Sequence, residues 1–172
     1  MVASRQKQRS APAKQRHEQD VVPTREQFSA AAKQRHEAAL QLLESAKSPK
    51  PQVAGYLNVV AMECLLKARI LAQAEKSRVS ELRPFLGDDT YKQLFRSSEG
   101  HRLGRLAEQA ALRRLLAAAG LSSLLQKKAW SRMCKDERPY SLRYGTEKLH
   151  TEEAIEEVQV GSDLLAAIEN AP

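Results

Sequence analysis

The chain has 172 residues and a formal net charge of +7, enough length for one domain with a sizeable hydrophobic core. Apolar residues make up 42% of it, chiefly Ala and Leu, and aromatic residues only 5%, which favours helices over sheet. The two cysteines, Cys64 and Cys134, are too few for a disulfide framework or a metal site, so we expect a cytoplasmic setting and no metal. No apolar run approaches the ~18 residues that span a bilayer, so we expect no membrane segment.

Two similar segments of eleven residues occur near the start of the chain, QRSAPAKQRHE at 8–18 and QFSAAAKQRHE at 27–37. The second copy continues an apolar stripe at helical spacing, whereas the first contains Pro12 and has no apolar face. We therefore expect a basic flexible tail over residues 1–22 and a folded domain over 23–172. A local duplication is the favoured interpretation, with a histidine pair, His17 and His36, binding a ligand as the alternative.

The first two helices are predicted from local signals. Thr24 and Gln27 have the spacing of a capping box, and Pro49 and Pro51 should end the helix that begins there. The next helix, over 52–75, is apolar on nearly every side and should be the buried centre of a bundle. Its exceptions, Glu63 and Lys67, are four residues apart in the order that favours an ion pair.

The second half of the chain should be helical with interruptions. Residues 77–100 are polar and predict a connection with a short helix at 90–95. A continuous helix is predicted over 103–119, ended by Gly120 in a left-handed cap, and another helical piece over 122–134 capped by Ser122 or Ser123. Residues 136–150 predict a loop, and 151–169 the final helix, with Gly161 as its weak point.

Positive charge is concentrated in the third quarter of the chain. Residues 101–133 hold seven Lys and Arg against one acid. Such a region could neutralise phosphates, or it could be the solvated face of an amphipathic helix. The binding candidates are Arg102, Arg105, Arg113, Arg114, Lys127 and Lys128.

The motifs in this order resemble those of HEPN domains. They are GYLNVVAMECLLKARI in the second helix, GHRLGRL at the start of the third, and Arg-Tyr before an acidic last helix. The resemblance covers residues 24–170 and implies an all-α, four- to five-helix up-and-down bundle of the kind found in prokaryotic toxin–antitoxin and defence systems. The residues that fall on the family signature are Tyr56, Glu63, Lys67, His101 and Tyr144.

Many members of that family are metal-independent ribonucleases with an Arg and a His near the start of the last helix. Arg143 and His150 match this pattern, with a histidine to move a proton and an arginine to stabilise charge on phosphate. Tyr144 and Gly145 depart from it, because the family usually has a polar residue after the arginine and a helix between the pair. Without catalysis, Arg143 is expected to pair with Glu147 or Glu153.

Two functions follow from the resemblance. The first is a module that binds RNA, a nucleotide or a partner protein such as a nucleotidyltransferase or an antitoxin. The second is a dimeric ribonuclease that uses Arg143 and His150. No Gly-rich phosphate loop or serine-nucleophile motif supports another enzyme class or a cofactor.

Overall fold

The structure is a computed structural model that describes residues 22–45, 49–135 and 138–170. These residues are all-helical, as predicted, and their one extended pairing is the isolated bridge between Thr24 and Arg78. The predicted flexible tail lies outside the described residues, apart from Val22, which packs against the core. None of the helices in the described ranges is long and apolar enough to span a membrane.

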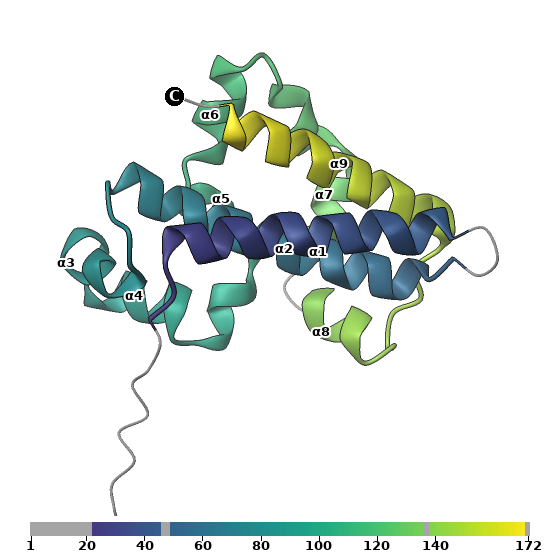
Figure 1. Ribbon diagram of the computed structural model, residues 1–172, viewed down its shortest axis with the longest axis horizontal. Coiled ribbons are helices and arrows are strands. Elements are labelled where there is room, and N and C mark those ends of the chain that lie inside the picture. Colours follow the sequence, from purple (N-terminus) through teal and green to yellow (C-terminus); the bar gives the residue numbers. More distant parts are fainter. Residues whose placement is uncertain (1–21, 46–48, 136–137, 171–172) are drawn as a thin grey trace, which may run out of the picture.

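Helices α1, Arg25–Glu44, and α2, Pro51–Gln73, form the central pair (Figure 1). The predicted capping box starts α1: the Gln27 N–H donates to the Thr24 hydroxyl, 3.2 Å away, and the Thr24 N–H donates to the Gln27 side chain, 2.9 Å away. Pro51 is the first residue of α2, where its missing N–H leaves no hydrogen bond unmade. Local sequence signals therefore place both helices.

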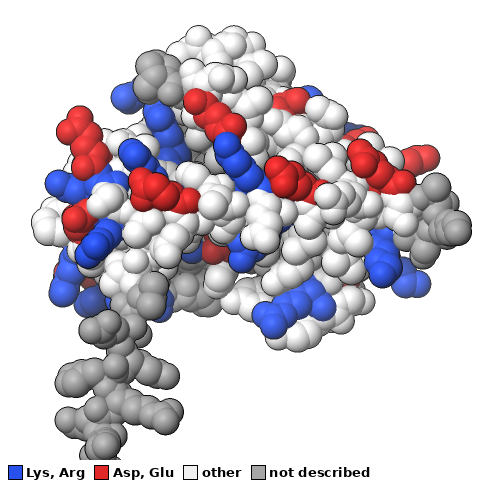
Figure 2. Space-filling view, in the orientation of Figure 1, with Lys and Arg blue, Asp and Glu red and all other residues white. Residues whose placement is uncertain are grey.

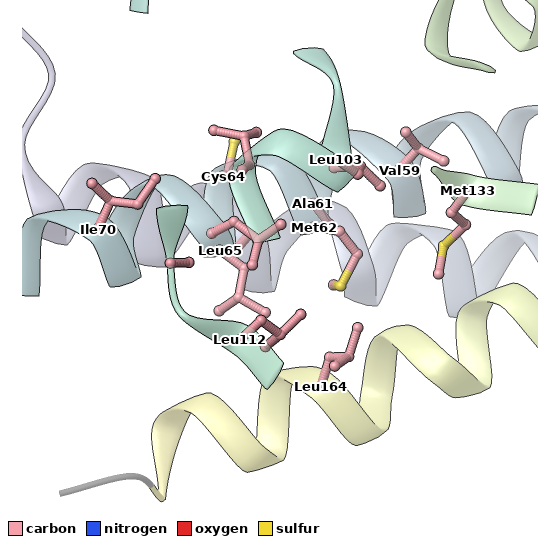
Figure 3. Close-up of a cluster of buried hydrophobic side chains, with 14 of the residues drawn as sticks. Val59, Ala61, Met62, Cys64, Leu65, Ile70, Leu103, Leu112, Met133 and Leu164 are labelled. Carbon is pink, nitrogen blue, oxygen red and sulfur yellow. The ribbon is translucent and has the colours of Figure 1, made fainter. Parts of the chain in front are cut away.

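Helix α2 is the centre of the core, as its apolar sequence predicted. Helix α9, Thr151–Glu169, packs against both α2 and α1, so that α2 is enclosed on several sides. In Figure 3, Met62 of α2 lies near Leu112 and Leu164, which come from α6 and α9. Trp130 is 7% exposed and packs in the same cluster.

The part of the chain between α2 and α9 forms short helices. The predicted short helix in the connection is present as α4. In chain order these elements are η1 (Val79–Leu82), α3 (Arg83–Leu86), α4 (Asp88–Phe95), η2 (Ser98–His101), α5 (Leu103–Gln109), α6 (Leu112–Ala118), η3 (Ser122–Gln126), α7 (Lys128–Met133) and α8 (Arg138–Arg143). Within the described residues α1, α2 and α9 have 20, 23 and 19 residues and the other helices have eight or fewer, and the four- to five-helix up-and-down bundle stays a prediction.

The helix predicted over 103–119 is broken in two. Ala111 lies in the left-handed region with φ 47°, between α5 and α6. The side-chain amide of Gln73 donates to the Ala110 carbonyl, 2.8 Å away, and so satisfies an acceptor that a continuous helix would have used. The break allows α5 to pack on α2 and α6 to pack on α9. Gly120, with φ 72°, follows α6 as the predicted left-handed residue.

Two further boundaries differ from the prediction. Ser122 and Ser123 lie within η3 and make no side-chain cap; α7 begins at Lys128, after the extended residue Lys127. The segment predicted as a loop contains α8, in which Pro139 occupies the second position, where a helix tolerates proline. The residues after α8 turn at Gly145, with φ 68°, before α9 begins.

A buried histidine from the duplicated segment joins three helices. Asn58 on α2 donates its amide to the Glu157 carbonyl, 2.8 Å away, so its Oδ1 faces His36 of α1. The His36 Nδ1, 3.0 Å from that oxygen, is therefore the donor, and its Nε2 lies 2.8 Å from the Ser162 hydroxyl on α9. Within the described ranges no group of three metal-ligating side chains occurs, and His17 lies outside them.

A buried ion network ties α7 and α8 to α9. Both Arg132 Nε and Arg138 Nη2 contact Oε1 of Glu157, at 3.1 and 2.5 Å, and Arg138 also pairs with Glu147. Burial raises the pKa of Glu157, while the two guanidinium groups act in the opposite direction. Arg138 is 1% exposed, so this network holds α8 in place rather than offering a free cation.

Candidate functional site

The predicted catalytic residues Arg143 and His150 are separated by the turn at Gly145. Arg143 is the last residue of α8, whereas His150 is the residue before α9, and both are exposed. The Arg143 guanidinium lies 5.6 Å from the centre of the Tyr144 ring, and the His150 backbone N–H donates to the Glu153 carboxylate, 3.2 Å away. In the part of the chain that the structure describes, no hydrogen bond or ion pair joins Arg143 to His150.

The expected pairing of Arg143 with an acid is also not observed. Glu147 pairs with Arg138 and with the Ser141 hydroxyl, 2.8 Å away. The Arg143 guanidinium thus makes a cation–π contact with the Tyr144 ring and remains exposed at the protein surface. It does not take part in the ion pairs that hold α8 against α9.

Three of the residues on the family signature meet in space. The Glu63 carboxylate lies 2.6 Å from the Lys67 ammonium through one oxygen and 2.8 Å from Nδ1 of His101 through the other. Glu63 and Lys67 are buried, so the predicted pair lies inside the protein rather than at the edge of an exposed face. The His101 side chain is 43% exposed, and the buried carboxylate fixes the orientation of its ring.

The same histidine connects this cluster to α8. Its ring meets that of Tyr140 edge to face, with centres 6.0 Å apart. Tyr140 lies on α8 and Tyr144 directly follows it, and they are 43% and 70% exposed, so two large aromatic side chains face solvent at this end of the helix. We define the α8 surface as His101, Arg102, Tyr140, Arg143 and Tyr144.

Charge on the visible face of the molecule is unevenly arranged. Figure 2 shows acidic and basic side chains close together over α1, and basic side chains bordered by uncharged surface near α8. The remaining signature residue, Tyr56, is partly buried against the core and belongs to neither group. The sequence predicted roles for four residues of the α8 surface separately, but not for Tyr140, which lies in a segment predicted to be a loop.

The six predicted basic binding residues do not form one surface. Arg102 adjoins His101 at the α8 surface, and Arg105 lies 3.4 Å from the Gln93 side-chain oxygen. Arg114 and Lys127 line a cavity between α2, α6, η3 and α9, whereas Arg113 lines a smaller one beside Trp130. Lys128 is exposed at the start of α7.

No protein-family model matches this chain, and no curated protein and no solved structure is significantly similar to it. Function therefore has to be inferred from the chemistry of the surface. Exposed aromatic rings beside fixed cations can stack with planar groups and neutralise neighbouring negative charge. The α8 surface provides both features, from α8 and the turn that follows it.

Proposed function

We propose that this protein is an HEPN-like helical module that binds single-stranded RNA on the α8 surface, as part of a prokaryotic toxin–antitoxin or defence-type system. The observation that carries the proposal is the exposure of Tyr140 and Tyr144, with Arg143 beside one ring and His101 beside the other. The resemblance to HEPN domains supplies the biological setting and the preference for RNA.

The chemistry of single-stranded nucleic acids matches this surface. Unstacked bases lose contact with their neighbours and recover it by stacking on aromatic side chains, which is worth about 1–3 kcal/mol per base. Cations beside the rings contact the phosphates between successive bases. Among the described residues no carboxylate forms an ion pair with Arg143, so its charge is available to contact a phosphate.

The rigidity of the surface also supports binding. Buried ion pairs of Arg138 with Glu147 and Glu157 fix α8 against α9, and the Glu63 carboxylate fixes the ring of His101. Side chains that are already oriented lose less conformational freedom when a ligand binds. The backbone of α8 and the ring of His101 are therefore already held in place before a base binds.

Fluorescence anisotropy with a labelled RNA of about 12 nucleotides, within the usual range of single-strand site sizes, tests the proposal. Tyr140→Ala and Tyr144→Ala should each weaken binding by roughly 5- to 150-fold, the equivalent of one lost stacking contact. Phe85→Ala is the matched control, because Phe85 is an aromatic residue 58% exposed on α3, outside the α8 surface.

Two further measurements compare the salt dependence of RNA binding between wild type and an Arg143 variant, and the affinity for RNA with that for DNA. Arg143→Gln should weaken binding across all sequences and reduce the slope of log affinity against log salt by about one contact. A DNA strand of the same sequence tests the preference for RNA. Equal binding by wild type and both tyrosine variants, or an equal loss in Phe85→Ala, would rule out the α8 surface as the RNA site.

A further inference from the structure

A second feature of the molecule lies away from the α8 surface. A cavity of about 1000 Å³ opens between α2, α6, η3 and α9, within the range of small-molecule sites. In Figure 1, α6 and α8 lie on opposite sides of the α1–α2 pair. A ligand in this cavity would therefore occupy a site separate from the proposed RNA surface.

The cavity wall is aliphatic. Eight of its lining residues are alanine or leucine, contributed by α6, η3, α9 and the segments beside them, and none of its lining residues is aromatic. A planar base would find no ring to stack against, whereas a flexible hydrocarbon chain gains by displacing water from such a surface. The lining favours an aliphatic body in the ligand.

Positive charge is added to this apolar wall by Arg69, Arg114 and Lys127. Lys127 is matched by Asp163, 3.3 Å away. Among the described residues, neither Arg69 nor Arg114 has a carboxylate within ion-pair distance, and Nε of Arg69 is buried without a hydrogen-bond acceptor. The buried Nε–H of Arg69 is costly to leave without an acceptor, and an anion that binds there offsets that cost, with the exposed Arg114 adding a second positive charge beside it.

We propose that this cavity binds a fatty-acid-like anion, with its hydrocarbon chain against the alanines and leucines and its carboxylate beside Arg69 and Arg114. Arg69 projects from the buried helix α2 and Arg114 from α6, so the ligand would bridge the central helix and the segment after the break at Ala111. The site adds a small-molecule ligand to a protein whose proposed function needs none.

Isothermal titration calorimetry of the full chain with decanoate, kept below its micelle concentration, tests the site. Wild type should bind decanoate and should bind decanol, which has the same chain without the charge, at least about ten-fold more weakly. Arg69→Met and Arg114→Gln should each weaken decanoate binding by about ten-fold or more. Arg113→Gln, a neighbouring arginine that does not line this cavity, should leave it unchanged.

A blocking variant keeps the test decisive if Arg69→Met does not fold. Ala118 is exposed and lines the cavity, so Ala118→Phe should place a ring across part of the cavity and weaken decanoate binding while circular dichroism stays that of wild type. Tyr144→Ala, which should weaken RNA binding, should bind decanoate normally, so the two proposals can fail separately. Absent binding by wild type, equal binding of decanol, or undiminished binding by Arg114→Gln and Ala118→Phe would overturn the proposal.

Discussion

The carboxamide of Asn58 on α2 lies directly over the α-carbon of Gly161 on α9. A Cβ on Gly161 would overlap the Asn58 side-chain oxygen far inside van der Waals contact distance. Asn58 cannot turn away cheaply, because its amide donates to the Glu157 carbonyl and its oxygen accepts from His36. The glycine that weakens α9 as an isolated helix is what lets α9 approach α2 closely.

We expect Gly161→Ala to destabilise the protein by about 1–3 kcal/mol, because the added methyl must displace a hydrogen-bonded side chain. Gly104→Ala is the matched control: Gly104 is also helical, but a Cβ there meets nothing within 4 Å. That substitution should stabilise by about 0.5–1 kcal/mol through helix propensity. Urea unfolding measures both, and a neutral Gly161→Ala would contradict the close packing.

Leu66→Ala should cost about 2–5 kcal/mol, since Leu66 is 1% exposed on the most enclosed helix. Val53→Ala, at a residue 45% exposed on the same helix, should cost far less. Thermal or urea unfolding gives the comparison. A loss below about 0.5 kcal/mol in Leu66→Ala would mean that the core lies elsewhere.

The Glu63–Lys67 pair should respond differently to single and double substitution. Glu63→Leu leaves a buried ammonium without its carboxylate and should cost about 3–5 kcal/mol, whereas Glu63→Leu with Lys67→Leu should recover most of that loss. Unfolding free energies of the wild type, both single variants and the double variant complete the cycle. Equal losses of unfolding free energy in the Glu63→Leu and double variants would show that the unpaired charge of Lys67 does not cause the destabilisation.

Purified protein incubated with labelled RNA and a chelator should leave the RNA intact. Gly145 turns the chain between Arg143 and His150, so the two side chains do not share the helical segment that the ribonuclease pattern requires. His150→Ala should then be nearly silent in stability and RNA binding, while Arg143→Ala weakens binding. Cleavage by wild type that either substitution removes would restore the ribonuclease hypothesis, and the double variant should then be scarcely worse than either single one.

The cysteines should resist alkylation in the folded protein. Burial raises the pKa of Cys134 to about 12 and also raises that of Cys64. At pH 8 only about one Cys134 thiol in ten thousand would be the reactive thiolate, and the fraction should grow tenfold per pH unit. Mass spectrometry after iodoacetamide should show slow labelling of native protein and rapid labelling in urea. Fast native labelling would mean that these thiols are more accessible than their packing indicates.

Much of the long-helix framework was predictable because its signals are local. The capping box at Thr24, the proline at Pro51 and the apolar character of α2 all act within a few residues of the helices they define. The break at Ala111 could not be predicted, because no glycine or proline marks it and the preceding carbonyl, that of Ala110, is satisfied by Gln73, 37 positions earlier. Likewise α8 forms in a segment rich in helix breakers, held by ion pairs of Arg138.

The candidate sites were only partly predictable for the same reason. The resemblance singled out Glu63 and His101, but their 2.8 Å contact joins positions 38 apart. Arg69 could not be predicted as a site residue, because its position beside a cavity depends on how α6 and α9 pack. An exposed tyrosine cannot be told from a buried one by sequence when its helix was expected to be a loop.

The contact between His36 and Ser162 spans 126 positions, which has a consequence for how the chain folds as it is synthesised. Helices α1 and α2 are adjacent in sequence and can pair while the ribosome is still making the rest. Until α9 emerges, His36 and Asn58 lack their α9 partners, and the apolar side of α2 that faces α9 stays uncovered. The nascent chain must therefore keep a hydrophobic surface from aggregating between the synthesis of α2 and that of α9, and would benefit from a chaperone during that interval.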